Sequence, residues 1–219
     1  MIIVGICGGS GSGKSTFAER IRDGLSCSCE IMRLDCYYFD QGGKPFEERT
    51  KVNYDSPEIF DFDEMLADIR LLIDGKPVTR KGYNYAEHRR DDSEELMYPP
   101  EVLIIEGIHV FYDDRICDIM NLKLFIKVDS DICLLRRIAR DMNERGRSLE
   151  SISEQYKATV KPMREKYIDR YIDKADVVVM RGGMNEQALK TTISYLKSCV
   201  KEQRSAESEK NESDGNDSE

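Results

Sequence analysis

Near the start of the chain, the apolar run Ile2-Ile3-Val4-Gly5-Ile6 leads directly into the stretch Gly8-Gly9-Ser10-Gly11-Ser12-Gly13-Lys14-Ser15. This stretch matches the G-x-x-x-x-G-K-[ST] pattern of a phosphate-binding loop. A strand that enters a glycine-rich turn and continues as a helix points consecutive backbone N–H groups into one concavity at the positive helix end. We therefore expect Lys14 to reach the outer phosphates of a nucleotide and the Ser15 hydroxyl to bind Mg²⁺. The alternative, a flexible Ser-Gly turn, is disfavoured by the lysine, the hydroxyl and the preceding strand.

Outward from this loop, short apolar runs alternate with longer segments that have helical spacing. This alternation is typical of an α/β fold in which helices cover both faces of a parallel sheet. The expected strands lie at residues 2–6, 30–34, 102–105, 122–128 and 175–180. The expected helices lie at residues 16–24, 63–73, 131–146, 151–172 and 185–203. The length suits one domain, which we place at residues 1–200.

Three segments stand outside this alternation. Residues 77–85 alternate around Gly82, which predicts a turn there and a small β-hairpin insertion over about residues 77–90. Residues 136–147 contain five arginines, and we expect a lid over about residues 136–150. A solvated basic helix face or a nucleic-acid site are the alternatives for the arginines. Residues 201–219 are almost free of apolar side chains, which predicts a disordered acidic tail.

Composition limits the classes of partner and the compartment. The net charge of -9 and the pI near 5.0 argue against nucleic acid or an anionic membrane as the main partner. The seven cysteines show neither a disulfide framework nor zinc spacing, which indicates a reducing compartment. No signal sequence or membrane-spanning segment is evident. We therefore expect a cytoplasmic protein.

Two carboxylates follow apolar runs and are candidates for chemistry. Glu106 ends the run Val102-Leu103-Ile104-Ile105, where an acid would lie beside the Mg²⁺ of the phosphate loop. Asp35 follows the second run, on a strand expected next to the first strand or one strand removed. A carboxylate there can accept the proton of an attacking hydroxyl. The alternatives are a solvent-facing glutamate and a turn or capping aspartate.

The expected hairpin carries Tyr83, Tyr85 and His88. Aromatic faces stack on planar bases, and an imidazole can exchange hydrogen bonds with a base edge. Packing of strand tyrosines is the alternative. The other histidine, His109, suits a loop or structural position, and we assign it no role.

Several of these segments together resemble a known family. Residues 8–16, 34–38, 53–57, 83–88, 105–108 and 136–147 recur in this order and at similar spacing in the uridine kinase family. The resemblance extends from near Met1 to about Leu196, and residues 143–148 are particularly specific to the family. It implies a P-loop kinase fold with a five-stranded parallel core. It also implies transfer of the γ-phosphoryl group of ATP to the 5′-hydroxyl of uridine or cytidine, with Mg²⁺, by a homotetramer.

The resemblance also implies roles for individual residues. On the donor side, Asp35 is similar to the catalytic base, and Ser15 and Glu106 to the Mg²⁺ partners. ATP would be bound by residues 8–16, which include Lys14 and Thr16, and by Arg140; Lys14, Arg140 and Arg145 would also neutralise charge during transfer. On the acceptor side, the matched residues are Asp55 and Arg137 for the ribose, Tyr83 and His88 for the base, Tyr85 as a further aromatic wall, and Arg147 and Gln155.

The chain departs from the family pattern at Asn84, where many relatives have an acidic residue, and at Met184 near the expected adenine. Two other functions stay open. A related kinase of phosphoribulose or pantothenate would share the loop and Asp35, although the Tyr83, Tyr85 and His88 group favours a planar base. A regulatory P-loop NTPase is disfavoured because the chain has no Asn-Lys-x-Asp motif. The sequence leaves open whether GTP can replace ATP as the donor.

Overall fold

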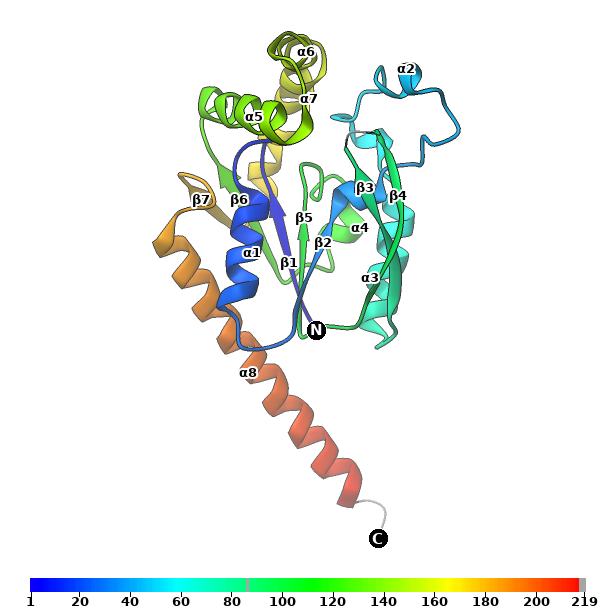
Figure 1. Ribbon diagram of the computed structural model, residues 1–219. Helices are drawn as coiled ribbons and strands as arrows, with labels where there is room; N and C mark the ends of the chain where they lie inside the picture. Colours follow the sequence, from blue (N-terminus) through cyan, green and yellow to red (C-terminus); the bar gives the residue numbers. More distant parts are fainter. Residues whose placement is uncertain (86, 217–219) are drawn as a thin grey trace.

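The computed structural model describes residues 1–85 and 87–216 and contains a five-stranded parallel sheet flanked by helices (Figure 1). The strand order is β2-β5-β1-β6-β7, so β5 separates β2 from β1. The strands are β1 Ile2–Cys7, β2 Cys29–Arg33, β5 Val102–Glu106, β6 Leu122–Lys127 and β7 Val177–Met180. All five strands predicted from the apolar runs are confirmed. Of the two placements expected for β2, next to β1 or one strand removed, the structure has the second.

Two hydrophobic clusters cover the two faces of this sheet. Successive β1 side chains alternate between them, so Val4 packs in one cluster and Ile3 in the other. Helix α1 (Lys14–Gly24) and helix α8 (Glu186–Asn216) cover the first face. Helix α3 (Phe62–Ile73), the short helix α4 (Asp114–Cys117) and the 3₁₀ segment Ile168–Lys174 cover the other face. The sheet is therefore buried on both sides, as parallel sheets usually are.

The predicted hairpin exists, but its details differ from the prediction. Strands β3 (Val78–Asn84) and β4 (Arg89–Met97) pair antiparallel, so the insertion reaches Met97 instead of ending near residue 90. Gly82 is not in the turn: it lies at a register shift within β3. The turn follows Asn84 and includes His88 at φ 50°, while residue 86 lies outside the described residues. The sequence does not predict strand β4 beyond about residue 90, because charged residues occupy both of its faces and leave no apolar alternation.

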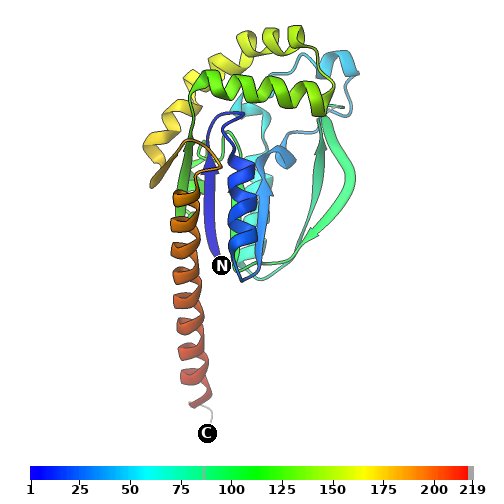
Figure 2. The ribbon, with the colours of Figure 1, turned by 60° about the vertical axis from the view of Figure 1, so that its left-hand side comes forward.

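Above the carboxyl ends of the strands, a helical layer follows β6 (Figure 2). Helix α5 (Ser130–Arg145) ends at Gly146, whose left-handed conformation (φ 62°) closes the helix. Helix α6 (Leu149–Gln155) continues through a π-helical turn (Tyr156–Val160) into α7 (Lys161–Lys166). The five arginines of the expected lid therefore lie on α5 and in the loop just after it.

The end of the chain differs from the sequence prediction. Helix α8 continues to Asn216 and extends beyond the body of the molecule, whereas the sequence predicts disorder from residue 201 (Figure 1). An ion pair between Arg204 and Glu101, with N···O 2.6 Å, ties this extension to the start of β5. Alanine, glutamate and lysine side chains also favour a helix without needing a hydrophobic core. Residues 217–219 lie outside the described residues.

Three short helical segments connect β2 to α3. They are helix α2 (Phe46–Arg49) and the 3₁₀ turns Leu34–Tyr37 and Pro57–Ile59.

Within residues 1–85 and 87–216, no helix combines the length and hydrophobicity of a membrane span.

Candidate active site

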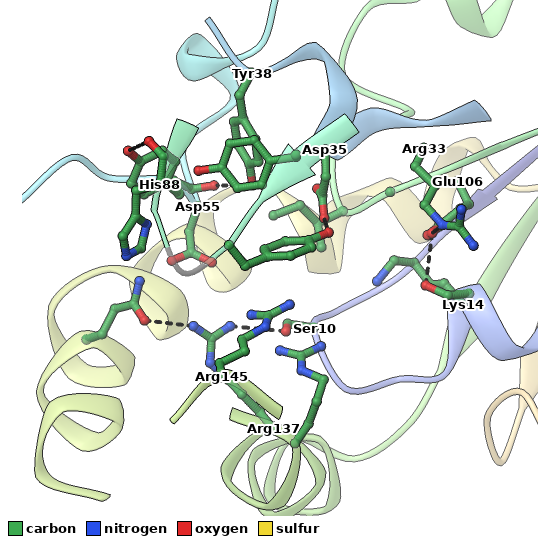
Figure 3. Close-up of a pocket in the computed structure, with 18 of the residues that line it drawn as sticks. Ser10, Lys14, Arg33, Asp35, Tyr38, Asp55, His88, Glu106, Arg137 and Arg145 are labelled. Carbon is green, nitrogen blue, oxygen red and sulfur yellow. Dashed lines mark hydrogen bonds and ion pairs between the residues drawn. The ribbon is translucent and has the colours of Figure 1, made fainter. Parts of the chain in front are cut away.

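A cavity of about 270 Å³ lies where the carboxyl ends of β1, β2 and β5 meet the helical layer and the hairpin (Figure 3). It brings together fourteen residues that the sequence predicts for the site. They are Ser10, Lys14, Ser15, Asp35, Asp55, Tyr83, Tyr85, His88, Glu106, Arg137, Arg140, Arg145, Arg147 and Gln155. The other predicted residues, Gly8, Gly9, Gly11, Ser12, Gly13 and Thr16, do not line it and instead form the loop backbone and the first turn of α1.

The phosphate loop connects β1 to α1 through glycines in conformations that other residues rarely adopt. Gly11 and Gly13 have φ of 82° and 91°. A Cβ on Gly11 would lie 2.3 Å from the carbonyl oxygen of Cys133, so backbone from α5 packs directly against the loop. Lys14 is buried, and its Nζ donates a hydrogen bond of 3.2 Å to the carbonyl oxygen of Gly9. The loop is thus held in one shape by its neighbours.

Beside Lys14, a hydroxyl and a carboxylate converge at the start of α1. The Oγ of Ser15 donates to Oε1 of Glu106 over 2.9 Å. Burial raises the pKa of the Glu106 carboxyl, and the Lys14 ammonium opposes that rise. The described residues contain no group of three or more His, Cys, Asp or Glu placed to hold a metal. A hydroxyl and one carboxylate beside an open cavity nevertheless fit Mg²⁺, which takes its other ligands from water and phosphate oxygens.

Across the cavity, Asp35 lies in the 3₁₀ turn that follows β2. Its Oδ2 accepts a hydrogen bond of 2.6 Å from the Tyr85 hydroxyl. Desolvation in the cavity, together with the nearby Asp35 carboxylate, raises the pKa of the Tyr85 phenol, so this hydroxyl stays protonated and donates. The guanidinium of Arg145 lies 4.1 Å from the centre of the Tyr85 ring. Tyr85 therefore links the hairpin, the lid arginines and Asp35.

Asp55 is a buried carboxylate at the inner end of the cavity. Its Oδ2 accepts a hydrogen bond of 2.9 Å from the Thr159 hydroxyl on the π-helical turn. Burial raises the pKa of Asp55, and the nearby Arg137 guanidinium opposes that rise. Arg137 donates to the Ser10 hydroxyl over 3.1 Å and to Oε1 of Gln155 over 2.9 Å, which joins the phosphate loop to α6.

An aromatic wall closes the hairpin side of the cavity. The Tyr83 ring lies 4.7 Å from that of Tyr38 and 5.1 Å from that of Tyr85, centre to centre. The His88 ring stacks on Tyr54 at 5.1 Å. Burial lowers the pKa of His88, and nearby arginines lower it further, so this imidazole is neutral near pH 7. The wall presents planar apolar faces together with one neutral imidazole.

Four residues of or around the cavity were not singled out from the sequence. Tyr38, Tyr54 and Arg33 line the cavity. The two tyrosines belong to segments that carry the family resemblance, which was the available signal. Asp141, fully buried on α5, forms ion pairs with the arginines around it. An acid within an arginine run was visible in the sequence, but nothing in the spacing showed that it would be buried.

His109, to which the sequence assigned no role, is a fully buried residue behind Asp55. One ring nitrogen lies 2.8 Å from the main-chain oxygen of Asp55, and the other lies 2.9 Å from the Tyr171 hydroxyl. Burial lowers the pKa of His109 to about 4. The neutral ring supports the backbone that carries Asp55.

Comparison with known proteins places this site in context. Residues 3–188 match the model of the phosphoribulokinase / uridine kinase family. The chain is 41% identical over 201 residues to a uridine kinase of Ligilactobacillus salivarius, covering 91% of this chain and 94% of that protein. It is also 41% identical over 204 residues to a uridine kinase of Streptococcus gordonii, covering 93% of this chain and 97% of that protein.

Solved structures share the fold at lower sequence identity. A phosphoribulokinase from Rhodobacter spheroides superposes with a TM-score of 0.60 at 16% identity, covering 82% of this chain and 69% of that one. A structure described as a possible uridine kinase from Bacillus stearothermophilus gives 0.56 at 16% identity, covering 81% and 87%. The family match, the extent of the similarity to the curated relatives and the P-loop kinase fold agree. The chain belongs to the phosphoribulokinase / uridine kinase family.

Proposed function

We propose that this protein transfers the γ-phosphoryl group of ATP to the 5′-hydroxyl of uridine or cytidine. One observation carries the proposal: a single cavity contains Lys14 and Ser15 of the phosphate loop together with Asp35, an aromatic wall and a neutral imidazole. The loop supplies a donor side, and the remaining groups supply an acceptor side that suits a planar base. The relatives named uridine kinase support this acceptor class.

On the donor side, loop N–H groups and Lys14 would hold the phosphates of ATP, with Ser15 and Glu106 holding Mg²⁺. When bound, Mg²⁺ would neutralise part of the charge on the phosphate oxygens. The buried position of Glu106 and its hydrogen bond from Ser15 keep both oxygen ligands in a fixed place before substrate arrives. Little rearrangement of these two side chains is then needed.

On the acceptor side, Asp35 would orient the 5′-hydroxyl and take its proton as the phosphoryl group moves. The hydrogen bond from Tyr85 fixes the direction of this carboxylate. Asp55, with Arg137 beside it, would hold the ribose hydroxyls, and Tyr83, Tyr85 and His88 would hold the base. The acceptor groups come from separate elements, so a complete nucleoside is needed to engage them all together.

The arginines above the cavity would neutralise the transferring group and exclude water. Arg140, Arg145 and Arg147 line the cavity from α5 and the loop after it. Guanidinium groups there can bind phosphate oxygens in the transition state. Closure of this layer over a bound nucleoside would suppress hydrolysis of ATP by water.

The proposal extends to the setting of the reaction. All seven cysteines are free, which suits a reducing, cytoplasmic compartment. The family resemblance supports a homotetramer and a place in pyrimidine salvage.

Product analysis with a panel of acceptors tests the proposal. The protein is incubated with Mg-ATP and, separately, with uridine, cytidine, ribulose 5-phosphate, pantothenate or no acceptor, and with GTP in place of ATP. We expect UMP or CMP to form, with little ADP in the absence of a nucleoside. Phosphorylation of ribulose 5-phosphate or pantothenate instead would show a related small-molecule kinase. Retained nucleotide without phosphorylation of any acceptor would indicate a regulatory NTPase.

A further inference from the structure

Asp141 is the most deeply buried charged group beside the cavity. Its side chain on α5 is 0% exposed. Four guanidinium groups pair with it: Arg140 at 2.8 Å and Arg145 at 3.2 Å through Oδ1, and Arg137 and Arg147 at 3.6 Å through Oδ2. One carboxylate therefore forms ion pairs with every arginine of the expected lid that lines the cavity.

The helix end explains how four arginines reach one carboxylate. Arg137 and Arg145 lie four residues before and after Asp141, so they share its helix face. Gly146 then turns the chain back in a left-handed conformation, and the backbone N–H of Arg147 donates to the carbonyl oxygen of Asp141 over 3.1 Å. This brings the Arg147 side chain onto the same carboxylate. The arrangement is set by local backbone geometry together with one acidic side chain.

From Asp141, contacts lead to both parts of the acceptor side. Arg145 lies over the ring of Tyr85, whose hydroxyl donates to Asp35. Arg137 and Arg147 both donate to Oε1 of Gln155, over 2.9 Å and 2.6 Å. Asp141 thus pairs directly with the arginine that lies over Tyr85 and with the two arginines that donate to Gln155.

The balance of charge indicates how this group is used. A single carboxylate cannot neutralise four guanidiniums, so the cluster keeps excess positive charge facing the cavity, available to phosphate. Oδ2 of Asp141 accepts no hydrogen bond from any described residue, although it is buried beside two arginines. A buried carboxylate oxygen that accepts no hydrogen bond destabilises the folded protein. Its presence here therefore indicates that the carboxylate is needed for the geometry of the arginines around it.

We propose that Asp141 is a positioning residue that holds Arg137, Arg140, Arg145 and Arg147 in the orientation needed for phosphoryl transfer while leaving their excess charge for the phosphates. This inference rests on the proposed function. It differs from a purely structural role in one respect. Without the carboxylate, anion binding should persist, because the positive charges remain, while transfer should fail, because the arginines are no longer directed.

The test compares Asp141→Asn with the wild-type enzyme. The matched control is Asp131→Asn, which removes the same charge from an exposed position in the first turn of α5. Each full-length variant is assayed for kcat, for KM of uridine and ATP, and for ADP affinity by calorimetry without an acceptor. For Asp141→Asn we expect kcat to fall about 100-fold, the scale seen when a directed transition-state contact is lost. ADP affinity should stay within about threefold of wild type or increase, because a nearby negative charge is gone.

Two results would overturn the proposal: a kcat of Asp141→Asn within threefold of the control, or an ADP affinity that falls by the same factor as kcat. Asp141→Glu covers the case in which the asparagine variant does not fold. It keeps the charge but moves it by one methylene, so kcat should fall about tenfold with the melting temperature and ADP affinity retained. Wild-type kcat in that variant would equally contradict a positioning role.

The same experiment separates this inference from the proposed function. Wild-type turnover on the acceptor panel tests the proposed function, whereas the ratios between variants test Asp141 on whichever acceptor the wild type uses. ADP affinity needs no acceptor at all. In an Arg140→Met background, Asp141→Asn should cost less than 100-fold in kcat, because one of its four arginine partners is already gone and partners in one network are not additive. An equal loss in both backgrounds would contradict the proposal, because Arg140 is one of the arginines that Asp141 is proposed to hold.

Discussion

The donor and acceptor sides of the cavity are built in different ways. The donor side is a continuous loop of backbone between β1 and α1, locked by contacts such as the close approach of Cys133 to Gly11. The acceptor side is assembled from side chains on the β2 turn, the hairpin, α5 and α6. A backbone site is encoded locally and is rigid. A site of separate side chains depends on residues behind it, which here include Thr159, His109 and Asp141.

This contrast predicts that acceptor-side changes abolish transfer without loss of nucleotide binding. The largest effect is expected for Asp35→Asn, which removes the proposed base but keeps the size of the side chain. We expect kcat to fall by about 10² to 10⁴, the range of general-base catalysis, with ADP affinity unchanged. Steady-state kinetics and calorimetry measure the two quantities, with Asp40→Asn as an exposed control in the same segment. A kcat within tenfold of wild type would remove Asp35 from the mechanism.

A substitution in the phosphate loop should impair the donor side alone. In Gly11→Ala, the new Cβ would meet the carbonyl oxygen of Cys133 at 2.3 Å, and φ of 82° is strained for alanine. We expect kcat/KM for ATP to fall by about 10² to 10³, because loop N–H groups no longer converge on the phosphates. Uridine affinity, measured by calorimetry without nucleotide, should change little. Equal losses for both substrates would mean that the two sides are not independent. Gly75→Ala, also at positive φ but with no atom near the new Cβ, is the control.

A smaller effect is expected where the acceptor side reads the base. His88→Ala removes a neutral imidazole stacked on Tyr54. We predict that KM for uridine rises about 10- to 100-fold, as expected when one or two hydrogen bonds to a buried partner are lost. KM for ATP should stay unchanged. Initial rates with each substrate varied in turn give both constants, and a parallel rise in both would argue against contact with the base.

The smallest effect is expected on the free energy of unfolding, through His109, which supports the backbone of Asp55. The pKa of His109 is about 4 in the folded protein against 6.5 when unfolded, so the unfolded chain binds the proton first as pH falls. Its contribution to stability is complete above pH 6.5 and is lost between 6.5 and 4. We expect wild type to lose about 2 kcal/mol more stability than His109→Gln between pH 7 and pH 5.

Urea unfolding of both proteins at the two pH values measures this difference. The raised pKa values of Asp55 and Glu106 act in the opposite direction, because stability from those groups increases as they gain protons. They are present in both proteins and cancel in the comparison. Identical pH dependence in the two proteins would show that His109 is not held neutral by the fold.

The difference between a continuous backbone loop and a site of separate side chains also explains what could be predicted from the sequence. The β1 strand, the phosphate loop and α1 are consecutive, so motif and periodicity suffice to predict them. The five parallel strands were also predicted, because buried strands are continuous apolar runs. The extent of the hairpin was not, since β4 is charged on both faces, and neither was the continuation of the last helix beyond residue 203, which is supported by an ion pair to Glu101.

Within the site, sequence reasoning identified the groups that face the cavity but not those that hold them. Asp35, Glu106 and His88 carry signals in their position after a strand or in their residue type. Thr159 and the contact of His109 with Asp55 depend on packing between elements far apart in the chain, and local patterns do not encode that packing. The arginine partners of Asp141 are its neighbours in the sequence, but their spacing does not show that the carboxylate is buried. The motif and the positions after strands suggested roles for Lys14, Ser15, Glu106 and Asp35, whereas the roles of Asp55, Arg147 and Gln155 came only from resemblance to the family. All of these roles stay predictions.

In the proposed reaction, the donor and acceptor sides of the cavity work as one site. Following the γ-phosphoryl group tests it most directly: the protein is mixed with γ-labelled Mg-ATP and uridine or cytidine, and labelled products are separated with time. If the two sides form one site, label will appear in UMP or CMP in amounts equal to the ADP formed, with little labelled inorganic phosphate. ADP formation with the label released as inorganic phosphate, in the presence of either nucleoside, would contradict it.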